Sequence, residues 1–156
     1  MGMPWDVIRH WNYARLTGYA VKLLFELRAQ YTGYNNGNLI ATWTHMQARG
    51  WRSKETLHMA LNELIYYGWI TRTRKGKKLG GTHYPSLYAL TWEAIDDCNK
   101  GFTGTLTPSH AWKLDRDRWQ RPERKRKVTN PSTESVSAKY GNRTGPGTVS
   151  VLHAKA

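Results

Sequence analysis

The sequence of 156 residues has very little cysteine, only Cys98. A single cysteine excludes a disulfide within the chain and a zinc site built from paired cysteines. The six histidines fall in separate segments and show neither the HxxxH nor the HExxH spacing of a metal-binding helix. We therefore expect neither a bound metal nor any other cofactor.

Groups that would support catalysis are also scarce. Asp96 and Asp97 are the only adjacent acidic pair, and adjacent side chains point in different directions, so they make a poor general acid/base couple. Gly80-Gly81 is not followed by the lysine-serine helix start of a phosphate-binding loop. Because the sequence contains no catalytic constellation, we expect a protein that is not an enzyme.

Long apolar runs are missing as well. No run approaches the roughly 20 residues that a membrane-spanning helix needs. The first residues, Met1-Gly2-Met3-Pro4, lack the charged and apolar regions of a signal peptide. We therefore expect a cytoplasmic protein without a membrane partner, and the nucleoid of a bacterial cell is its expected place.

The sequence is poor in acidic residues. It contains 24 Lys and Arg residues against 11 Asp and Glu residues, which gives a net charge of +13. Residues 1–98 hold 12 basic and 7 acidic side chains, and residues 99–156 hold 12 and 4, so more than half of the excess lies in the second part. Such a balance favours a polyanion as partner, since each Lys or Arg that neutralises a phosphate releases a counterion. Double-stranded DNA is the partner that we expect.

Two helices with a tight turn between them are predicted in residues 42–67. Thr42 is an N-cap type residue in front of an apolar pattern of helical spacing, and Gly50 is expected to end this first helix in the left-handed conformation. Trp51 then places an apolar anchor in the corner. Ser53 is expected to cap the second helix, over residues 53–67.

The second helix has one apolar and one polar face. The apolar stripe comprises Leu57, Ala60, Leu61, Leu64 and Ile65. At about 100° per residue, the opposite face comprises Lys54, Glu55, His58, Met59, Asn62 and Tyr66. In a helix-turn-helix, the amino end of such a helix enters the major groove.

A β-hairpin is predicted after the second helix, because residues 69–74 and 86–92 are rich in β-branched and aromatic side chains. The loop between them, residues 75–84, is rich in glycine and carries three lysines, as a flexible arm on phosphates would.

An earlier helix is predicted from Leu16 to Tyr31, with Thr17 as its cap and Arg28 among its outward residues. A short strand is expected at residues 38–40. Residues 1–15 form an apolar extension that packs either on this domain or against a second copy of the chain.

The order of these parts resembles the winged-helix family, notably the GntR-like and MarR-like bacterial DNA-binding domains, over residues 16–92. The resemblance implies an α+β fold in which a three-helix helix-turn-helix core carries a β-hairpin wing, here within residues 16–98. Winged helices also serve as replication initiators and as protein-docking modules, so the resemblance speaks to the fold more than to the role.

The predicted DNA contacts follow from this arrangement. Base contacts are expected from Lys54, Glu55, His58, Met59 and Asn62, of which Asn62 could reach adenine by two hydrogen bonds. Backbone contacts are expected from Thr42, Arg52, Ser53, Arg72, Arg74, Lys75, Lys77 and Lys78. Two alternatives stay open here, since His58 could be an ordinary surface residue and Arg72 and Arg74 could cover the hairpin with their aliphatic stems.

Residues 99–156 are rich in glycine, proline, serine and threonine, which predicts a basic, mostly disordered tail. Further contacts to the DNA backbone are expected from its densest basic cluster, Arg121, Arg124, Lys125, Arg126 and Lys127. The alternative is a solvated tail that binds nothing.

The leading hypothesis is a sequence-specific DNA-binding protein that regulates transcription, and a homodimer on paired half-sites is one arrangement open to it. The first alternative is a phage or plasmid replication-initiation or partition protein built on the same domain, which would need repeated origin sites. The second is an adaptor that binds protein through the apolar spot formed by Met59 and Tyr66.

Overall fold

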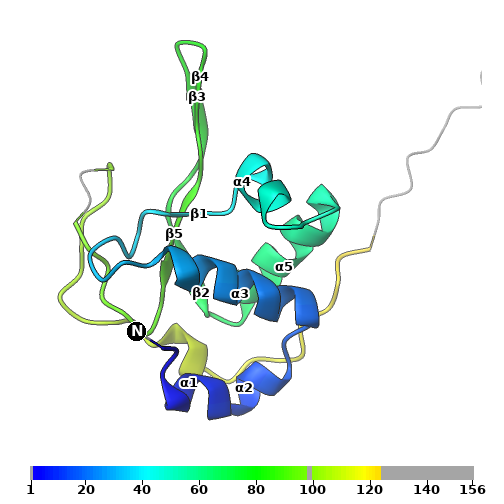
Figure 1. The fold of residues 1–156 in the computed structure, drawn as a ribbon. Helices are drawn as coiled ribbons and strands as arrows, with labels where there is room; N and C mark the ends of the chain where they lie inside the picture. Colours follow the sequence, from blue (N-terminus) through cyan, green and yellow to red (C-terminus); the bar gives the residue numbers. More distant parts are fainter. Residues whose placement is uncertain (1, 98–99, 124–156) are drawn as a thin grey trace, which may run out of the picture. The chain divides into compact units, whose positions relative to one another are not determined.

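The fold combines helices with a small antiparallel sheet (Figure 1), so the predicted α+β class is confirmed. The computed structural model describes residues 2–97 and 100–123. Its helices are α1 (Trp5–Arg9), α2 (Trp11–Ala14), α3 (Gly18–Gln30), α4 (Trp43–Ala48), α5 (Lys54–Tyr66) and the short 3-10 helix η1 (Ala111–Lys113). Its strands are β1 (Leu39–Ile40), β2 (Ile70–Arg74), β3 (Lys77–Leu79), β4 (Thr82–Tyr84) and β5 (Leu87–Leu90).

Local side-chain signals set where the two long helices begin. Thr17 Oγ1 accepts a hydrogen bond from the N–H of Ala20 at 3.3 Å, which caps α3. Ser53 Oγ accepts one from the N–H of Thr56 at 3.3 Å, which caps α5. Both predicted caps are therefore confirmed.

The corner between α4 and α5 also matches its prediction. Gly50 has a φ of +81°, and Trp51 is buried directly behind it. Thr42 occupies the N-cap position of α4, but its side chain makes no capping hydrogen bond. The short turn thus holds the two helices together through a buried indole.

The central strand of the three-stranded sheet is β5, in the order β1-β5-β2 with antiparallel neighbours. Helices α3 and α5 pack on each other and on the sheet, and one sheet face joins their core through Leu39, Ile70, Tyr88 and Leu90. The other face is covered as well, because Leu87 and Ala89 are also buried. Thr105 and Thr107 line a small hollow there, together with Ile95 and with Thr71 of β2.

The loop predicted to be a flexible arm is a second, paired hairpin. Strands β3 and β4 pair with Leu79 opposite Thr82. Gly80 and Gly81 form the turn with φ values of +54° and +81°, as in the two-residue turns whose twist matches that of the flanking strands. Both strands are exposed along their length, and this β3–β4 arm stands away from the rest of the domain (Figure 1).

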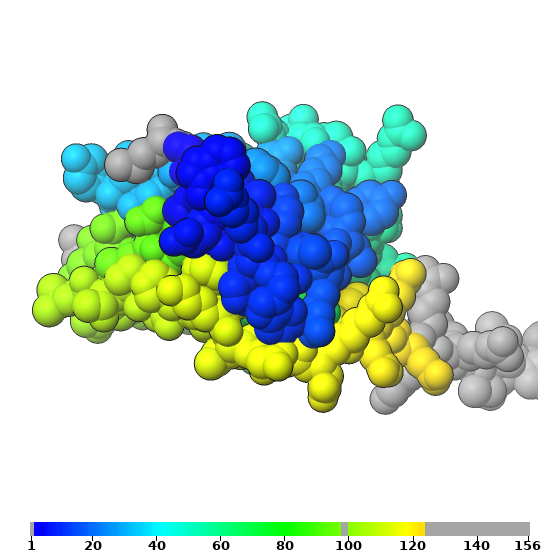
Figure 2. All heavy atoms as spheres, turned by 90° about the horizontal axis from the view of Figure 1, so that it is seen from below, coloured from blue at the N-terminus to red at the C-terminus, as the bar shows by residue number. Residues whose placement is uncertain are grey.

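Residues 100–122 pack on the domain beside α1 and α2, as the yellow and blue spheres of Figure 2 show. The fully buried Asn12 donates hydrogen bonds from Nδ2 to the carbonyl oxygens of Trp112 at 2.9 Å and Leu114 at 3.0 Å. Val7 of α1 joins the core, so the N-terminal extension packs on its own domain. The compact unit extends to Pro122, beyond the boundary at residues 98 and 99 that the sequence predicts.

Trp69 lies at the centre of this junction. Its ring stacks on that of Trp112 with the centroids 5.4 Å apart and an angle of 12° between the planes. The rings of His10, Tyr13 and Trp92 meet it edge-on at 6.5, 6.1 and 6.3 Å. One buried side chain therefore ties together segments from both ends of the described chain and from the sheet.

The end of α5 needs a glycine for this packing. Gly68 has a φ of +74°, and a Cβ on it would lie 2.5 Å from the carbonyl oxygen of Ala111 in η1. The close approach of η1 to the start of β2 thus depends on the missing side chain.

The orientation predicted for Arg28 was wrong. Its guanidinium is buried, donates from Nη2 to the carbonyl oxygen of Gly2 at 3.2 Å and lies 5.0 Å from the ring of Tyr31. The helical spacing could not show that the N-terminal residues cover this side of α3.

No helix in residues 2–97 and 100–123 is both long enough and apolar enough to cross a membrane. Cys98 and four of the tail residues predicted to contact DNA, Arg124, Lys125, Arg126 and Lys127, lie outside the described residues.

We expect Trp112→Ala to lower the free energy of unfolding by about 3–5 kcal/mol, because it removes a buried ring and leaves a cavity against Trp69. Urea denaturation followed by circular dichroism measures the change. The matched control is Trp5→Ala, whose side chain is 71% exposed and whose loss should cost little. Equal stability of the two variants would contradict the packing of residues 100–122 on the domain.

His10 should make stability depend on pH. Burial and then the positive charge of Lys113 hold the pKa of His10 below its ordinary value of 6.5, and its Nδ1 accepts the N–H of Asn12 at 3.2 Å. As the pH falls below about 6.5, the unfolded chain takes up the proton before the folded one, so stability falls with it. We expect thermal unfolding between pH 8 and pH 5 to show a smaller loss for His10→Asn than for the wild type. His45→Asn, at an exposed position of α4, should keep the wild-type dependence; the same dependence for His10→Asn would refute this role.

Candidate nucleic-acid interface

The outward face of α5 rests on its buried stripe, in which Leu57, Ala60, Leu61 and Leu64 are buried and Ile65 is half-buried. Lys54 and His58 are exposed on the outward side, and Asn62 is half-buried beside them. Asn62 Nδ2 lies 3.1 Å from His58 Nε2. Because the amide nitrogen can only donate, this bond requires the tautomer of His58 with its proton on Nδ1. The three side chains form a row of hydrogen-bonding groups on one side of the helix.

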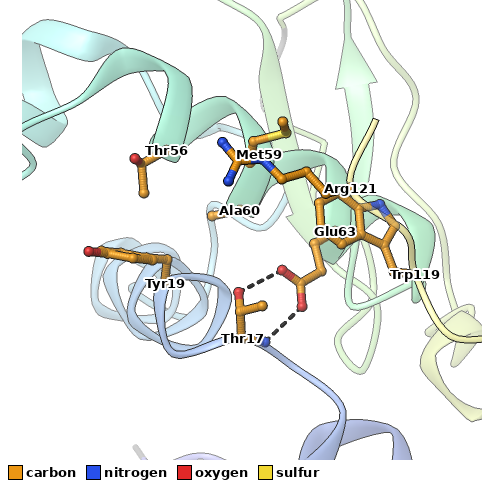
Figure 3. A pocket seen from close by; sticks show the side chains of 8 residues that line it. All are labelled: Thr17, Tyr19, Thr56, Met59, Ala60, Glu63, Trp119 and Arg121. Atoms are coloured by element: carbon orange, nitrogen blue, oxygen red, sulfur yellow. Dashed lines mark hydrogen bonds between the residues drawn. The ribbon is translucent and has the colours of Figure 1, made fainter. Parts of the chain in front are cut away.

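The other side of the predicted reading face is occupied by the chain itself. Met59 lines a hollow together with Trp119 and Arg121 (Figure 3). Arg121 Nη2 lies 3.7 Å from Glu55 Oε1. The structure therefore directs Glu55 and Met59 toward residues 119–121, apart from the row formed by Lys54, His58 and Asn62.

Glu63 has a structural role that was not predicted from the sequence. Its buried carboxylate accepts hydrogen bonds from the backbone N–H of Thr17 at 2.7 Å and from the Thr17 hydroxyl at 2.6 Å (Figure 3). These charge-assisted bonds fasten the amino end of α3 to the side of α5. The sequence signal for this role was the single carboxylate next to the apolar stripe of α5, together with Thr17 as a capping residue.

The amino end of α5 is cationic. Arg52 is exposed, and Lys54 Nζ lies 5.7 Å from the ring of Trp43 in α4. A hollow at this end is lined by residues 50–53 and by Lys22, whose Nζ lies 5.3 Å from the ring of Trp51. Free backbone N–H groups and the helix dipole favour an anion at such an end. Ser53, as the cap, holds the first turn in place.

Three exposed lysines lie on the β3–β4 arm and at its base. Lys77 and Tyr84 are paired across the two strands, with Lys77 Nζ 5.9 Å from the ring of Tyr84. Lys78 comes next along β3, so its side chain leaves the opposite face of the arm. With Lys75 at the base, the arm offers positive charge on both faces.

The two arginines of β2 differ in their surroundings. Arg72 is exposed, with its guanidinium 5.9 Å from the ring of Tyr88. Arg74 is half-buried and donates to the carbonyl oxygens of Lys100 at 3.0 Å and Pro85 at 3.3 Å. Arg74 thus ties the base of the arm to Pro85 and Lys100, which is the covering role left open by the sequence, while Arg72 faces solvent.

Within residues 2–97 and 100–123, no three His, Cys, Asp or Glu side chains gather in a way that could hold a metal ion. The polar groups near α5 and the arm are hydrogen-bonding and cationic, which suits binding to a polyanion better than acid/base chemistry.

Comparisons with protein-family models, with curated proteins and with solved structures find no match to this chain.

Proposed function

We propose that this protein binds double-stranded DNA through a winged-helix domain, with α5 in the major groove and the β3–β4 arm on the phosphate backbone. The observation that carries the proposal is the combination of an exposed, hydrogen-bonding row on α5 with a lysine-bearing arm. In Figure 1 the arm rises on the side of the molecule where α4 lies, and α1 and α2 lie on the opposite side.

The order of elements supports the winged-helix part of the proposal. The chain runs α3-β1-α4-α5-β2-β3-β4-β5, and its three-stranded sheet has the order β1-β5-β2. Two helices joined by a tight corner and followed by a hairpin match the arrangement that the resemblance to winged-helix proteins implies. The corner at Gly50 and Trp51 holds α4 against α5, so α5 is presented by a rigid support.

Base reading is proposed for Lys54, His58 and Asn62. The major groove admits a helix, and its base edges present acceptors to Lys and a donor-acceptor pair to Asn. In our proposal Glu55 and Met59 contribute less to reading than the sequence predicted, because residues 119–121 lie against them.

Phosphate binding is proposed for residues that surround this row. The arm supplies Lys75, Lys77 and Lys78, the sheet supplies Arg72, and the α4–α5 corner supplies Thr42, Arg52 and Ser53. The proposal rests on two observations: the cationic side chains in this set are exposed, and Thr42 and Ser53 lie at helix amino ends.

Regulation of transcription is the role that we propose for this activity. A replication-initiation or partition protein would use the same surface, and a requirement for several repeated sites in one duplex would distinguish it. The adaptor alternative is weakened, because its apolar spot is partly covered: Met59 borders the hollow with Trp119, and the guanidinium of Arg116 lies 5.9 Å from the ring of Tyr66.

Alanine substitution of Lys75, Lys77 and Lys78 together should weaken binding to all duplexes alike. The slope of log K against log salt should become shallower by about one for each lysine that contacts a phosphate. Fluorescence anisotropy with the duplex upstream of the protein's own gene and with a shuffled duplex, across a salt series, measures both effects. The control removes equal charge from exposed positions elsewhere, Arg9, Lys100 and Lys113. If the control weakened binding as much, the arm would have no special role.

Alanine substitution of His58 or Asn62 should change the preference among sequences. Each should cost about 1–3 kcal/mol on the preferred duplex, or roughly 5- to 150-fold, with little loss on the shuffled duplex. The control is His45→Ala, at an exposed position of α4. Equal weakening on both duplexes would count against base reading by α5.

A further inference from the structure

The tip of the β3–β4 arm lies in open space. A Cβ added to Gly80 or Gly81 would meet no atom within 4 Å other than those of its chain neighbours. Leu79, directly before this turn, is 63% exposed. The turn is the far end of the arm (Figure 1). A large aliphatic side chain is therefore presented beside the outermost point of a cationic arm.

The two faces of the arm differ in character. Residues opposite each other in an antiparallel pair share a face, and successive residues alternate between the faces. One face therefore carries Lys77 and Tyr84 near the base and Leu79 near the tip, and the opposite face carries Lys78. Each face thus has a lysine one or two residues back from the tip, and one face adds an apolar end.

Support of the arm itself leaves much of this apolar surface uncovered. The ring of Tyr84 lies 6.0 Å from the guanidinium of Arg74 and 5.9 Å from Lys77 Nζ, so it packs toward the base. Leu79 lies opposite Thr82 across the strands and keeps most of its side chain in water. Removal of this surface from water by a partner would be favourable, and the lysines around it favour a polyanion as that partner.

The dimensions of the arm match those of a DNA groove. The three residues of β3 advance by about 10 Å, at about 3.4 Å per residue. The minor groove is about 7.5 Å deep and about 6 Å wide. With the tip at the floor of such a groove, the side chains of Lys77 and Lys78 would reach the phosphates on its two rims.

A two-stranded ribbon needs a widened minor groove. Its backbones alone lie about 4.8 Å apart, and side chains add to this width. An apolar side chain that inserts between two base pairs unstacks them and kinks the duplex by about 20–90° toward the major groove. Such a kink opens the minor groove. Leu79 is the side chain of the arm that has the chemistry and the position for this insertion.

We propose that the tip of the β3–β4 arm enters the minor groove next to the groove occupied by α5, and that Leu79 inserts between two base pairs there and bends the duplex. The inference rests on the proposed function and adds DNA bending to it. Lys77 and Lys78 bind the phosphates of the two rims, and Gly80 and Gly81 keep the tip narrow enough to reach the floor.

Two fluorescence measurements test this insertion with the full chain and the duplex upstream of its own gene. Energy transfer between dyes at the two ends of the duplex reports bending. The base analogue 2-aminopurine, placed at one position after another, brightens where the bases unstack. We expect the bound duplex to be bent by about 20–90°, and we expect 2-aminopurine to brighten at one step only.

Substitutions of Leu79 distinguish insertion from support of the arm. Leu79→Ala should abolish the 2-aminopurine signal and reduce the bend by at least half, while the salt slope stays unchanged because no charge is removed. Leu79→Met, with an apolar side chain of similar volume, should retain both signals. Leu79→Thr favours a strand but is too short to insert, so it should behave like Leu79→Ala. The matched control is Leu106→Ala, an exposed leucine outside the arm, which should bend DNA as the wild type does.

The deformability of the duplex provides a second test. TA steps unstack easily, whereas A-tracts are stiff. With TA at the step that brightens, the wild type should bind about tenfold more tightly than with an A-tract step there, because stacking strength differs between steps. Leu79→Ala should bind the two duplexes equally.

The outcomes separate the two proposals. Absence of any complex with duplex DNA would defeat DNA binding and the insertion alike. A complex in which the duplex stays straight, or in which Leu79→Thr bends DNA as the wild type does, would defeat the insertion and leave DNA binding in place. If sedimentation showed that Leu79→Ala breaks up a dimer while bending is unchanged, Leu79 would belong to a contact between copies and the insertion would be overturned.

Discussion

Trp69 stacks on Trp112 at the point where α5 ends and β2 begins. Because α5 and the hairpin diverge from this point, whatever holds Trp69 also sets the angle between the helix and the arm. Gly68 keeps the approach open, and the edge-on rings of His10 and Trp92 close the remaining sides. The parts of the molecule that we propose to meet DNA are therefore oriented by a cluster on the far side of the domain, and aromatic contacts of this kind add about 0.5–1.5 kcal/mol each beyond burial.

The elements from α3 to β5 could be predicted because their signals are local. Capping residues such as Thr17 and Ser53 and the apolar spacing of α5 act within one or two helical turns. The packing of residues 100–122 could not be predicted, because it depends on partners about a hundred residues away and on few aliphatic side chains. This segment is held on the domain by the buried amide of Asn12 and by Trp112 and Trp119. In α3 an apolar stripe has this role. The two tryptophans were the signal in that otherwise polar stretch.

The candidate site also combines features that local signals predict with features that depend on distant contacts. The lysines of the arm were predictable as exposed, since a short glycine-rich hairpin has no core in which to bury them. Helical periodicity placed Glu55 and Met59 on the outward face of α5, and that is where they lie. Periodicity carries no information on what else lies on that face, however, and here it is a later part of the same chain. Arg74 is a second example, because its guanidinium donates to the carbonyl oxygens of Lys100 and Pro85, which follow β4 in the sequence.

The bond between Asn12 and the carbonyl oxygen of Trp112 spans 100 positions in the sequence. During synthesis, the N-terminal helices emerge early and must wait for η1 before their buried amide has its acceptors. At about 5–20 residues per second, that interval lasts about 5–20 seconds. During this interval, the apolar surface around Trp69 is not yet covered by the ring of Trp112. A nascent chain therefore completes the support of α5, and of the surface proposed to bind DNA, only when nearly all of the compact unit has left the ribosome.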